Sequence, residues 1–229
     1  MSERLPSGSE QETLLLFVRH PEAGQVKTRL IPALGAAGAA ALYERMAAAV
    51  ARRVAGLRRP GLRRVALVAP PGRVAAVGAW LGEGFTAEPQ ASGDLGARLT
   101  AAFAAAFAAG ARRVVAIGTD CLDLTPELVG AAFDALHRVD AVVGPALDGG
   151  YYLIALRRAI PAAFAAIPWS SPDALTVTLD GLQGAGASVH LLPRLRDLDT
   201  PEDLDALLPR WGALLRPLAE SAQPHEGAA

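Results

Sequence analysis

The stretch Arg113–Gly118 has the sequence RVVAIG, and Asp120 follows it after a single threonine. Valine and isoleucine make up half of this stretch, a composition that favours a buried β-strand. In open α/β sheets, ligands bind beyond the carboxyl ends of the strands. We therefore expect Asp120 to lie at the sheet edge where a ligand would bind.

Apolar runs of the same kind recur before and after this strand, with helical segments between them. The predicted strands are Thr13–Arg19, Arg64–Ala69, Phe85–Glu88, Arg113–Gly118, Asp140–Gly144, Tyr151–Leu156 and Ser188–Leu192. The predicted helices are Ala36–Leu57, Arg73–Leu81, Leu95–Ala109, Leu128–Arg138, Ala159–Ala166, Asp173–Gln183 and Pro201–Leu208. Strand and helix alternate at the spacing typical of βαβ units. This pattern predicts an α/β fold with a mostly parallel central sheet between two helical layers, a three-layer αβα sandwich.

The composition is that of one globular domain. The chain has 229 residues, of which 52% are hydrophobic and 20% charged, and this excludes a disordered protein. We predict a single domain over residues 13–216, with a disordered N-terminus at 1–12 and a flexible tail at 217–229. Since no segment has the pattern of a signal peptide or a membrane span, we expect a cytoplasmic protein without membrane insertion.

The charged residues and the cysteine narrow the class of protein further. The formal net charge of −1 gives no sign of nucleic acid as a partner. Cys121 is the sole cysteine, which excludes an internal disulfide, and we expect a buried small residue rather than a nucleophile. Lys27 is the single lysine among 22 basic residues. Either a compact ammonium is needed there or the lysine remains by chance, and composition favours neither alternative.

The loop after the first predicted strand is suited to phosphate. Gly24 lets backbone N–H groups approach an oxygen, while Lys27 and Arg29 supply positive charge. The spacing differs from that of a Walker A loop, because Gly24 does not directly precede the lysine. We take Gly24, Lys27, Thr28 and Arg29 as candidate nucleotide-binding residues, and a solvated basic turn is the alternative.

The segment after the third predicted strand offers contacts to a base. The side-chain amide of Gln90 would read the edge of a base, and Gly93 and Gly96 would let a ring lie against the backbone. The alternative is structural, because Asp94 is equally suited to cap the following helix.

Carboxylates after later strands are candidate metal ligands. Asp120 is the first choice for Mg²⁺ or Mn²⁺, since hard cations take oxygen ligands. Asp197 and Asp199 are candidates for further metal ligands, with a solvated turn before the last helix as the alternative.

The turn before Tyr151–Leu156 is a candidate acceptor site made of Asp148, Gly149, Gly150 and Tyr151. The two glycines let the chain turn closely under a ligand, and Asp148 would project a carboxylate toward it. The alternative is an ordinary Asp-Gly turn between two strands of a hairpin.

Five segments together carry a resemblance to a known family. They are Gly24–Leu30, Gly93–Gly96, Gly118–Cys121, Asp148–Tyr152 and Asp197–Leu204. They occur in the same order as in the DUF2064 proteins, also called the selenodomain-associated transferase or arsenosugar-biosynthesis glycosyltransferase-like family. The resemblance runs from about Leu14 to Leu208. Two departures are Arg19-His20, where the family usually has a small residue and a basic one, and Leu122, where proline is common.

The resemblance implies a GT-A, Rossmann-like fold of the nucleotide-diphospho-sugar transferase type. Its wider relatives include phospholactate guanylyltransferases and molybdopterin-cofactor nucleotidyltransferases. By this resemblance the first loop holds the nucleotide phosphates, the segment Gln90–Gly96 lies near the base, and Asp120 binds the divalent metal. Asp197 or Asp199 would be the additional metal-binding acid.

We therefore expect a metal-dependent, glycosyltransferase-like enzyme that uses a nucleotide sugar and a small-molecule acceptor. Lys27, Asp120 and Asp148 are the expected catalytic residues, with Asp148 positioning or deprotonating an acceptor hydroxyl. The first alternative is a nucleotidyltransferase that joins an NTP to a phosphorylated acceptor and needs no base. In that reaction, Asp148 would hold the metal or the acceptor. The alternative from another class is a non-catalytic nucleotide-binding protein, and a homodimer is left open.

Overall fold

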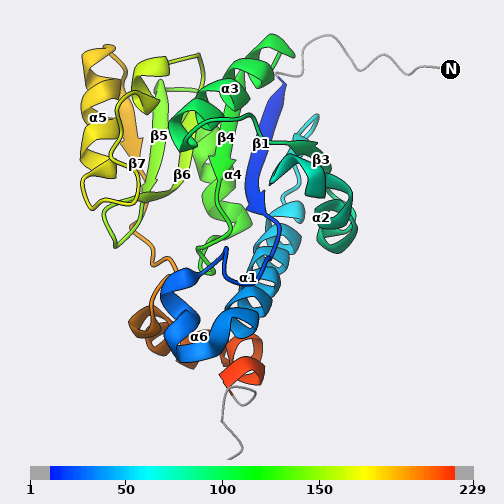
Figure 1. The fold of residues 1–229 in the computed structure, drawn as a ribbon. Helices are drawn as coiled ribbons and strands as arrows, with labels where there is room; N and C mark the ends of the chain where they lie inside the picture. Colours follow the sequence, from blue (N-terminus) through cyan, green and yellow to red (C-terminus); the bar gives the residue numbers. More distant parts are fainter. Residues whose placement is uncertain (1–10, 220–229) are drawn as a thin grey trace, which may run out of the picture.

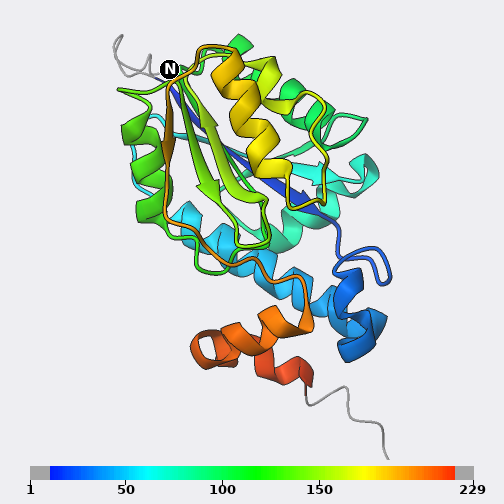
Figure 2. The same ribbon diagram turned by 90° about the vertical axis from the view of Figure 1, so that its left-hand side faces the viewer.

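The computed structural model describes residues 11–219. These residues form a seven-stranded sheet with helices on both faces (Figures 1 and 2). The strands are β1 (Glu12–Arg19), β2 (Arg63–Ala69), β3 (Thr86–Pro89), β4 (Arg113–Ile117), β5 (Ala141–Pro145), β6 (Tyr151–Leu156) and β7 (Val189–Leu191). They lie in the order β3-β2-β1-β4-β6-β5-β7, and β6 alone is antiparallel to its neighbours within this sheet of the described residues. The predicted mostly parallel sheet is confirmed.

The helices cover the sheet from both sides. They are α1 (Ile31–Ala55), α2 (Val74–Leu81), α3 (Leu95–Ala108), α4 (Pro126–Ala135), α5 (Ala174–Gly184) and α6 (Pro201–Ala219), with short 3-10 helices at Thr28–Leu30, Pro71–Arg73 and Pro161–Phe164. One core lies between the sheet and α1, α2 and α4 and extends to α6, which packs against α1, and a second core lies under α3 and α5. In β1, Leu14 and Leu16 belong to the first core and Leu15 to the second. The strand is continuously apolar because helices cover both of its faces.

The topology defines one edge of the sheet as the place for a ligand. β1 and β4 are parallel neighbours, so their carboxyl ends meet at the same edge. In Figure 1 this is the lower edge, and the first part of α1 and the whole of α6 lie beyond it. The loops that follow β1 and β4 therefore face these two helices rather than open solvent alone.

Two helices predicted in the C-terminal part of the chain differ from the structure in length. The predicted helix Ala159–Ala166 is only the 3-10 turn Pro161–Phe164, because the backbone is non-helical on both sides: Ile160 (φ −134°, ψ 78°) precedes the turn and the extended Ala165 (φ −81°, ψ 132°) follows it. The predicted helix Pro201–Leu208 continues as α6 to Ala219. Residues 217–219, predicted to belong to a flexible tail, are therefore helical.

The boundaries near the N-terminus also differ. Glu12, predicted to be disordered, is buried in β1, where its carboxylate pairs with Arg59 (2.5 Å) and Arg113 (3.0 Å). Helix α1 begins at Ile31, ahead of the predicted start, and bends at Gly35 (φ 70°). The rest of the two predicted termini, residues 1–10 and 220–229, lies outside the described residues. Between residues 11 and 219, no helix is long and apolar enough to cross a membrane.

Candidate functional site

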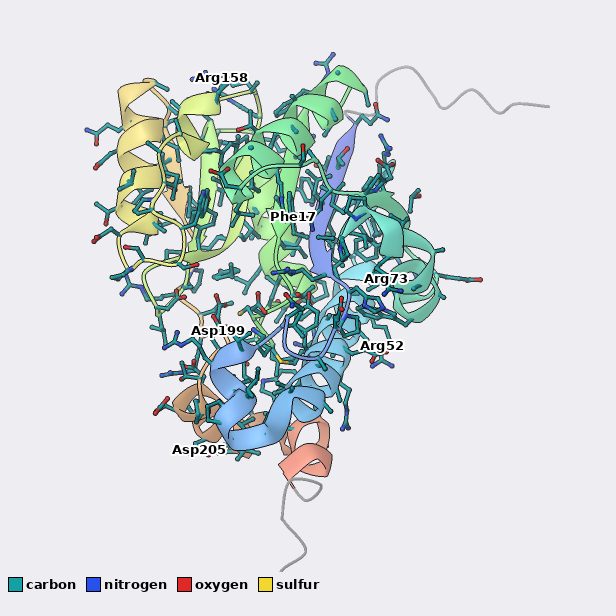
Figure 3. All side chains as sticks on the ribbon, in the orientation of Figure 1. Phe17, Arg52, Arg73, Arg158, Asp199 and Asp205 are labelled. Atoms are coloured by element: carbon teal, nitrogen blue, oxygen red, sulfur yellow. The ribbon has the colours of Figure 1, made fainter. Side chains whose placement is uncertain are left out.

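A pocket of about 580 Å³ opens at the edge where β1 and β4 end. Expected site residues that line it are Lys27, Thr28, Arg29, Gln90, Asp120, Tyr151 and Asp199. Gly24, Gly93, Gly96, Asp148, Gly149, Gly150 and Asp197 are not among the lining residues. Figure 3 shows Asp199 at this lower edge of the sheet, whereas Arg158 lies at the opposite edge. The pocket thus unites the first loop with the carboxylates that follow β4 and precede α6.

Lys27 lines this pocket and pairs with two of its acidic residues. Its backbone is left-handed (φ 48°, ψ 43°), and its side chain is only 4% exposed. The ammonium Nζ forms an ion pair with Asp120 and a second one with Asp199, at 2.6 Å from Oδ1. Burial opposes the charged form, but the two carboxylates outweigh it and raise the pKa of Lys27 above its usual value. Lys27 therefore remains a cation and joins two loops.

The segment that carries Asp199 is fixed by hydrogen bonds. Oδ2 of Asp203 accepts hydrogen bonds from the backbone N–H groups of Asp199 (3.2 Å) and Thr200 (3.0 Å). The N–H of Leu198 donates to the backbone carbonyl of Asp120 (2.9 Å). The start of α6 is thus attached directly to the loop after β4, which sets the separation of the two carboxylates.

Asp197 lies close to Asp120 and Asp199, but it differs from them in its hydrogen bonding. Within residues 11–219 its Oδ1 is a buried atom without a hydrogen-bond partner. Burial, followed by the negative charges of Asp120 and Asp148, raises the pKa of Asp197 to about 8. The negative charges at this edge thus act on one another, and the ammonium of Lys27 only partly offsets them at Asp197.

Tyr43 is a pocket residue that sequence reasoning missed. Its hydroxyl accepts hydrogen bonds from the backbone N–H of Arg19 (2.8 Å) and from Oγ1 of Thr119 (3.1 Å). The hydroxyl therefore connects the end of β1 to the end of β4, immediately before Asp120. Burial, followed by the charge of Asp120, raises the pKa of Tyr43. Its position within the apolar, Ala-rich helix α1 gave no signal that separates it from an ordinary core residue.

The polar groups and glycines of the segment after β3 mainly form hydrogen bonds and packing contacts within the protein. Nε2 of Gln90 donates to the backbone carbonyls of Val18 (3.2 Å) and Leu67 (2.8 Å), so both amide protons serve the fold. A Cβ at Gly96 would lie 2.6 Å from the carbonyl oxygen of Phe164, so this glycine allows close packing. Asp94 caps α3 by accepting from the N–H of Ala97 (2.8 Å), as in the structural alternative.

The turn with Asp148 joins the antiparallel strands β5 and β6. The exposed carboxylate of Asp148 accepts a hydrogen bond from the N–H of Gly150 (2.9 Å) within the same turn. Gly149 lies against Pro172: a Cβ added to Gly149 would lie 2.5 Å from the Cα of Pro172. Tyr151 does line the pocket and contacts Trp169 edge to face, with ring centres 6.2 Å apart. This local geometry corresponds to the hairpin alternative for the two glycines.

The carboxylates of Asp120 and Asp199 lie on different loops and both pair with the ammonium of Lys27. Both converge on one cationic atom, so the space between them suits positive charge. In the described part of the chain, no three acidic, histidine or cysteine side chains form a preassembled metal site. Mg²⁺ does not need one, since one or two carboxylates usually hold it together with substrate phosphates and water. The oxygen donors present therefore fit such an ion.

Comparisons with known proteins agree on the family and the fold. A family model described as an uncharacterized protein conserved in bacteria (DUF2064) matches residues 50–171. A solved structure from Desulfovibrio desulfuricans G20, provisionally named a nucleotide-diphospho-sugar transferase, is 34% identical; the match covers 90% of this chain and 97% of that chain, with a TM-score of 0.79. A search of curated protein sequences gave no match.

More distant structures share the fold alone. CMP:2-keto-3-deoxy-manno-octonic acid synthetase, in complex with CTP, is 14% identical, with 89% of this chain and 99% of that chain covered and a TM-score of 0.56. A manganese complex of a protein from Mycobacterium tuberculosis H37Rv is 18% identical, with 87% and 99% covered and a TM-score of 0.54.

Proposed function

The chain belongs to the DUF2064 family, and we propose that it is a metal-dependent transferase with a nucleotide sugar as its donor. The fold is the nucleotide-diphospho-sugar transferase type expected from the sequence. The observation that carries the proposal is the convergence of Lys27, Asp120 and Asp199 in the pocket beyond β1 and β4. A relative with 34% identity bears the name of a nucleotide-diphospho-sugar transferase, which favours this donor class.

The cationic side chains of the first loop would act on the leaving group. Lys27 and Arg29 both line the pocket, where they would stabilise negative charge that builds on a departing diphosphate. Asp120 and Asp199 would hold Mg²⁺ or Mn²⁺, and when bound this ion would neutralise further phosphate charge. Tyr43 would keep the ends of β1 and β4 at a fixed separation, so that ammonium and carboxylates meet the same phosphates.

Nucleotidyl transfer is the second candidate, and the position of Asp148 favours it. In glycosyl transfer, the acceptor hydroxyl needs a group that takes its proton. In nucleotidyl transfer, the phosphate of the acceptor needs no such group. The carboxylate of Asp148 is exposed, accepts a hydrogen bond from Gly150 and does not line the pocket. The leaving group of this second reaction is pyrophosphate, on which Lys27, Arg29 and the carboxylates would act in the same way.

Ligand-induced thermal stabilisation tests the proposal. Nucleotide sugars and NTPs are screened with and without Mn²⁺ on the wild type, on Asp120→Asn and on the matched control Asp134→Asn. Asp134 is an exposed acid that pairs with Arg59 outside the pocket, so its amide variant should keep the response. We expect a Mn²⁺-dependent rise in Tm with a nucleotide sugar that Asp120→Asn abolishes.

The products then separate the candidate reactions. Release of a nucleoside phosphate with transfer of the sugar supports glycosyl transfer, and release of pyrophosphate from an NTP supports nucleotidyl transfer. Binding without turnover under any donor would instead support a non-catalytic nucleotide-binding protein. A metal-dependent response that survives in Asp120→Asn would contradict the assigned ligand.

A further inference from the structure

The ammonium of Lys27 lies where a cation shared by Asp120 and Asp199 has to lie. It forms ion pairs with both carboxylates, and it is almost fully buried while the two acids are 43% and 42% exposed. Mg²⁺ binds carboxylate oxygens at about 2.0–2.1 Å, so an ion ligated by both acids would occupy the space that Nζ now fills. Two cations at one point also repel each other strongly.

We propose that Lys27 and the divalent cation compete for the space between Asp120 and Asp199, so that tight cation binding requires phosphate groups to draw Lys27 away. This inference rests on the proposed function, because it takes Asp120 and Asp199 as the metal ligands. It adds an order of events: the metal enters with, or after, the phosphorylated ligand.

The chain at Lys27 is built for such an exchange. Lysine carries a compact charge on a flexible four-carbon stem, so Nζ can move without the backbone. Thr28 and Arg29 line the same pocket, so phosphate oxygens bound there would lie next to the lysine. An ammonium that leaves two carboxylates needs another anion, since an unpaired buried charge is costly. Phosphate supplies that anion, while the metal restores the positive charge between the acids.

The competition makes the two ligands cooperative. A phosphorylated ligand that binds Lys27 removes the competitor of the metal and raises its affinity. By thermodynamic linkage the metal raises the affinity of the phosphorylated ligand by the same factor. Without phosphate, the wild type should therefore bind metal weakly although both carboxylates are in place.

Mn²⁺ binding to variants of Lys27, measured without any nucleotide, tests the competition. Lys27→Met removes the ammonium but keeps a chain of similar length. Electron paramagnetic resonance of free Mn²⁺ at pH 7 gives the dissociation constant. We expect Lys27→Met to bind Mn²⁺ at least about tenfold more tightly than the wild type. The matched control is Arg29→Met, which removes the same charge two residues away, outside the ion pairs; it should change Mn²⁺ affinity by less than about threefold.

Further variants show which side chains are responsible for the gain in Mn²⁺ affinity. Adding Asp120→Asn to Lys27→Met should abolish the gain, which assigns it to the carboxylate pair. Lys27→Gln is a second variant with a neutral, polar side chain, and circular dichroism checks that each variant is folded. A Lys27→Gln protein should show the same direction of change, so the test does not depend on the methionine variant alone.

The outcomes separate this inference from the proposed function. Equal or weaker Mn²⁺ binding by folded Lys27→Met and Lys27→Gln overturns the competition, even where Asp120→Asn still abolishes the nucleotide- and Mn²⁺-dependent rise in Tm of the wild type. Loss of that rise in Asp120→Asn upholds the proposed metal ligand on its own. If Asp120→Asn leaves the rise intact, the proposed metal site fails, and the competition fails with it.

Discussion

Nε1 of Trp211 donates a hydrogen bond of 3.0 Å to Oδ1 of Asp123, and this bond fastens α6 to the loop that follows β4. Arg210 donates to the other carboxylate oxygen at 2.5 Å. The guanidinium of Arg53 in α1 lies 4.4 Å from the ring centre of Trp211. Because Asp199 lies two residues before α6 and Asp120 lies in the loop with Asp123, one helix restrains both carboxylates of the pocket.

Replacing Trp211 by phenylalanine should lower the free energy of unfolding by about 1–3 kcal/mol, because a carboxylate loses a partly buried donor while the ring remains over Arg53. Urea unfolding measures the change. Arg210→Gln is the control, since this arginine side chain is 62% exposed and its ion pair should contribute at most about 1 kcal/mol. Equal losses in the two variants would contradict the importance given to the indole.

Tyr43→Phe should destabilise the protein by about 1–3 kcal/mol. The change removes the acceptor for the N–H of Arg19 and for the buried hydroxyl of Thr119, and leaves both donors unsatisfied. Thermal unfolding gives the loss in stability. In the Mn²⁺-dependent ligand screen, Tyr43→Phe should also show a smaller rise in Tm, since the ends of β1 and β4 are no longer joined. Stability and ligand response both equal to wild type would remove Tyr43 from the site.

The central strands β1, β4, β5 and β6 could be predicted from the sequence because they are buried on both faces. Continuous apolar runs such as the one in β1 are strong signals, and each predicted strand overlaps a strand of the structure. The predicted bounds of a helix are wrong where a local backbone conformation determines its end. Ala165 is extended and Ala166 is left-handed directly after the turn Pro161–Phe164, and nothing in an alanine predicts either conformation.

The candidate site could be predicted only in part. Position after a strand identified Lys27 and Asp120, but their ion pair joins residues far apart in sequence, and spacing carries no information about it. Gln90 illustrates a second limit. The same amide can read a base or hold backbone carbonyls, and only its burial between Val18 and Leu67 shows which groups it bonds. Cys121 is buried as expected, and burial raises the pKa of its thiol to about 12.

Gly149→Ala should lower the free energy of unfolding by about 2–4 kcal/mol. The residue has φ +91°, where a side chain is strained, and an added Cβ would collide with the backbone of Pro172. The adjacent Gly150→Ala is the matched control, because its Cβ would meet only the movable carboxylate of Asp148, at 3.2 Å. We expect Gly150→Ala to cost less than about 1 kcal/mol in urea unfolding. The reverse order would contradict the close packing assigned to Gly149.

Asp140, which precedes β5 and bonds to Ser188 before β7, should make the free energy of unfolding depend on pH. Hydrogen bonds from the backbone and hydroxyl of Ser188, with further donors on Arg157 and Arg158, lower the pKa of Asp140 far below its usual value. The folded protein therefore favours the charged carboxylate. Its contribution is fully present above the ordinary aspartate pKa of about 4, and falls as the pH drops toward the lower pKa of the folded state.

Asp140→Asn should therefore reduce Tm by a constant amount from about pH 5 upward, and the difference from wild type should shrink as the pH falls below about 4. Thermal unfolding between pH 3 and pH 8 follows both proteins. Ser188→Ala is the control: it removes the hydroxyl donor but keeps the backbone donor, so it should show the same sign of pH dependence with a smaller amplitude. A difference that grows toward acidic pH would mean that the folded protein binds the Asp140 proton more tightly than the unfolded chain, the opposite of the hydrogen-bond pattern.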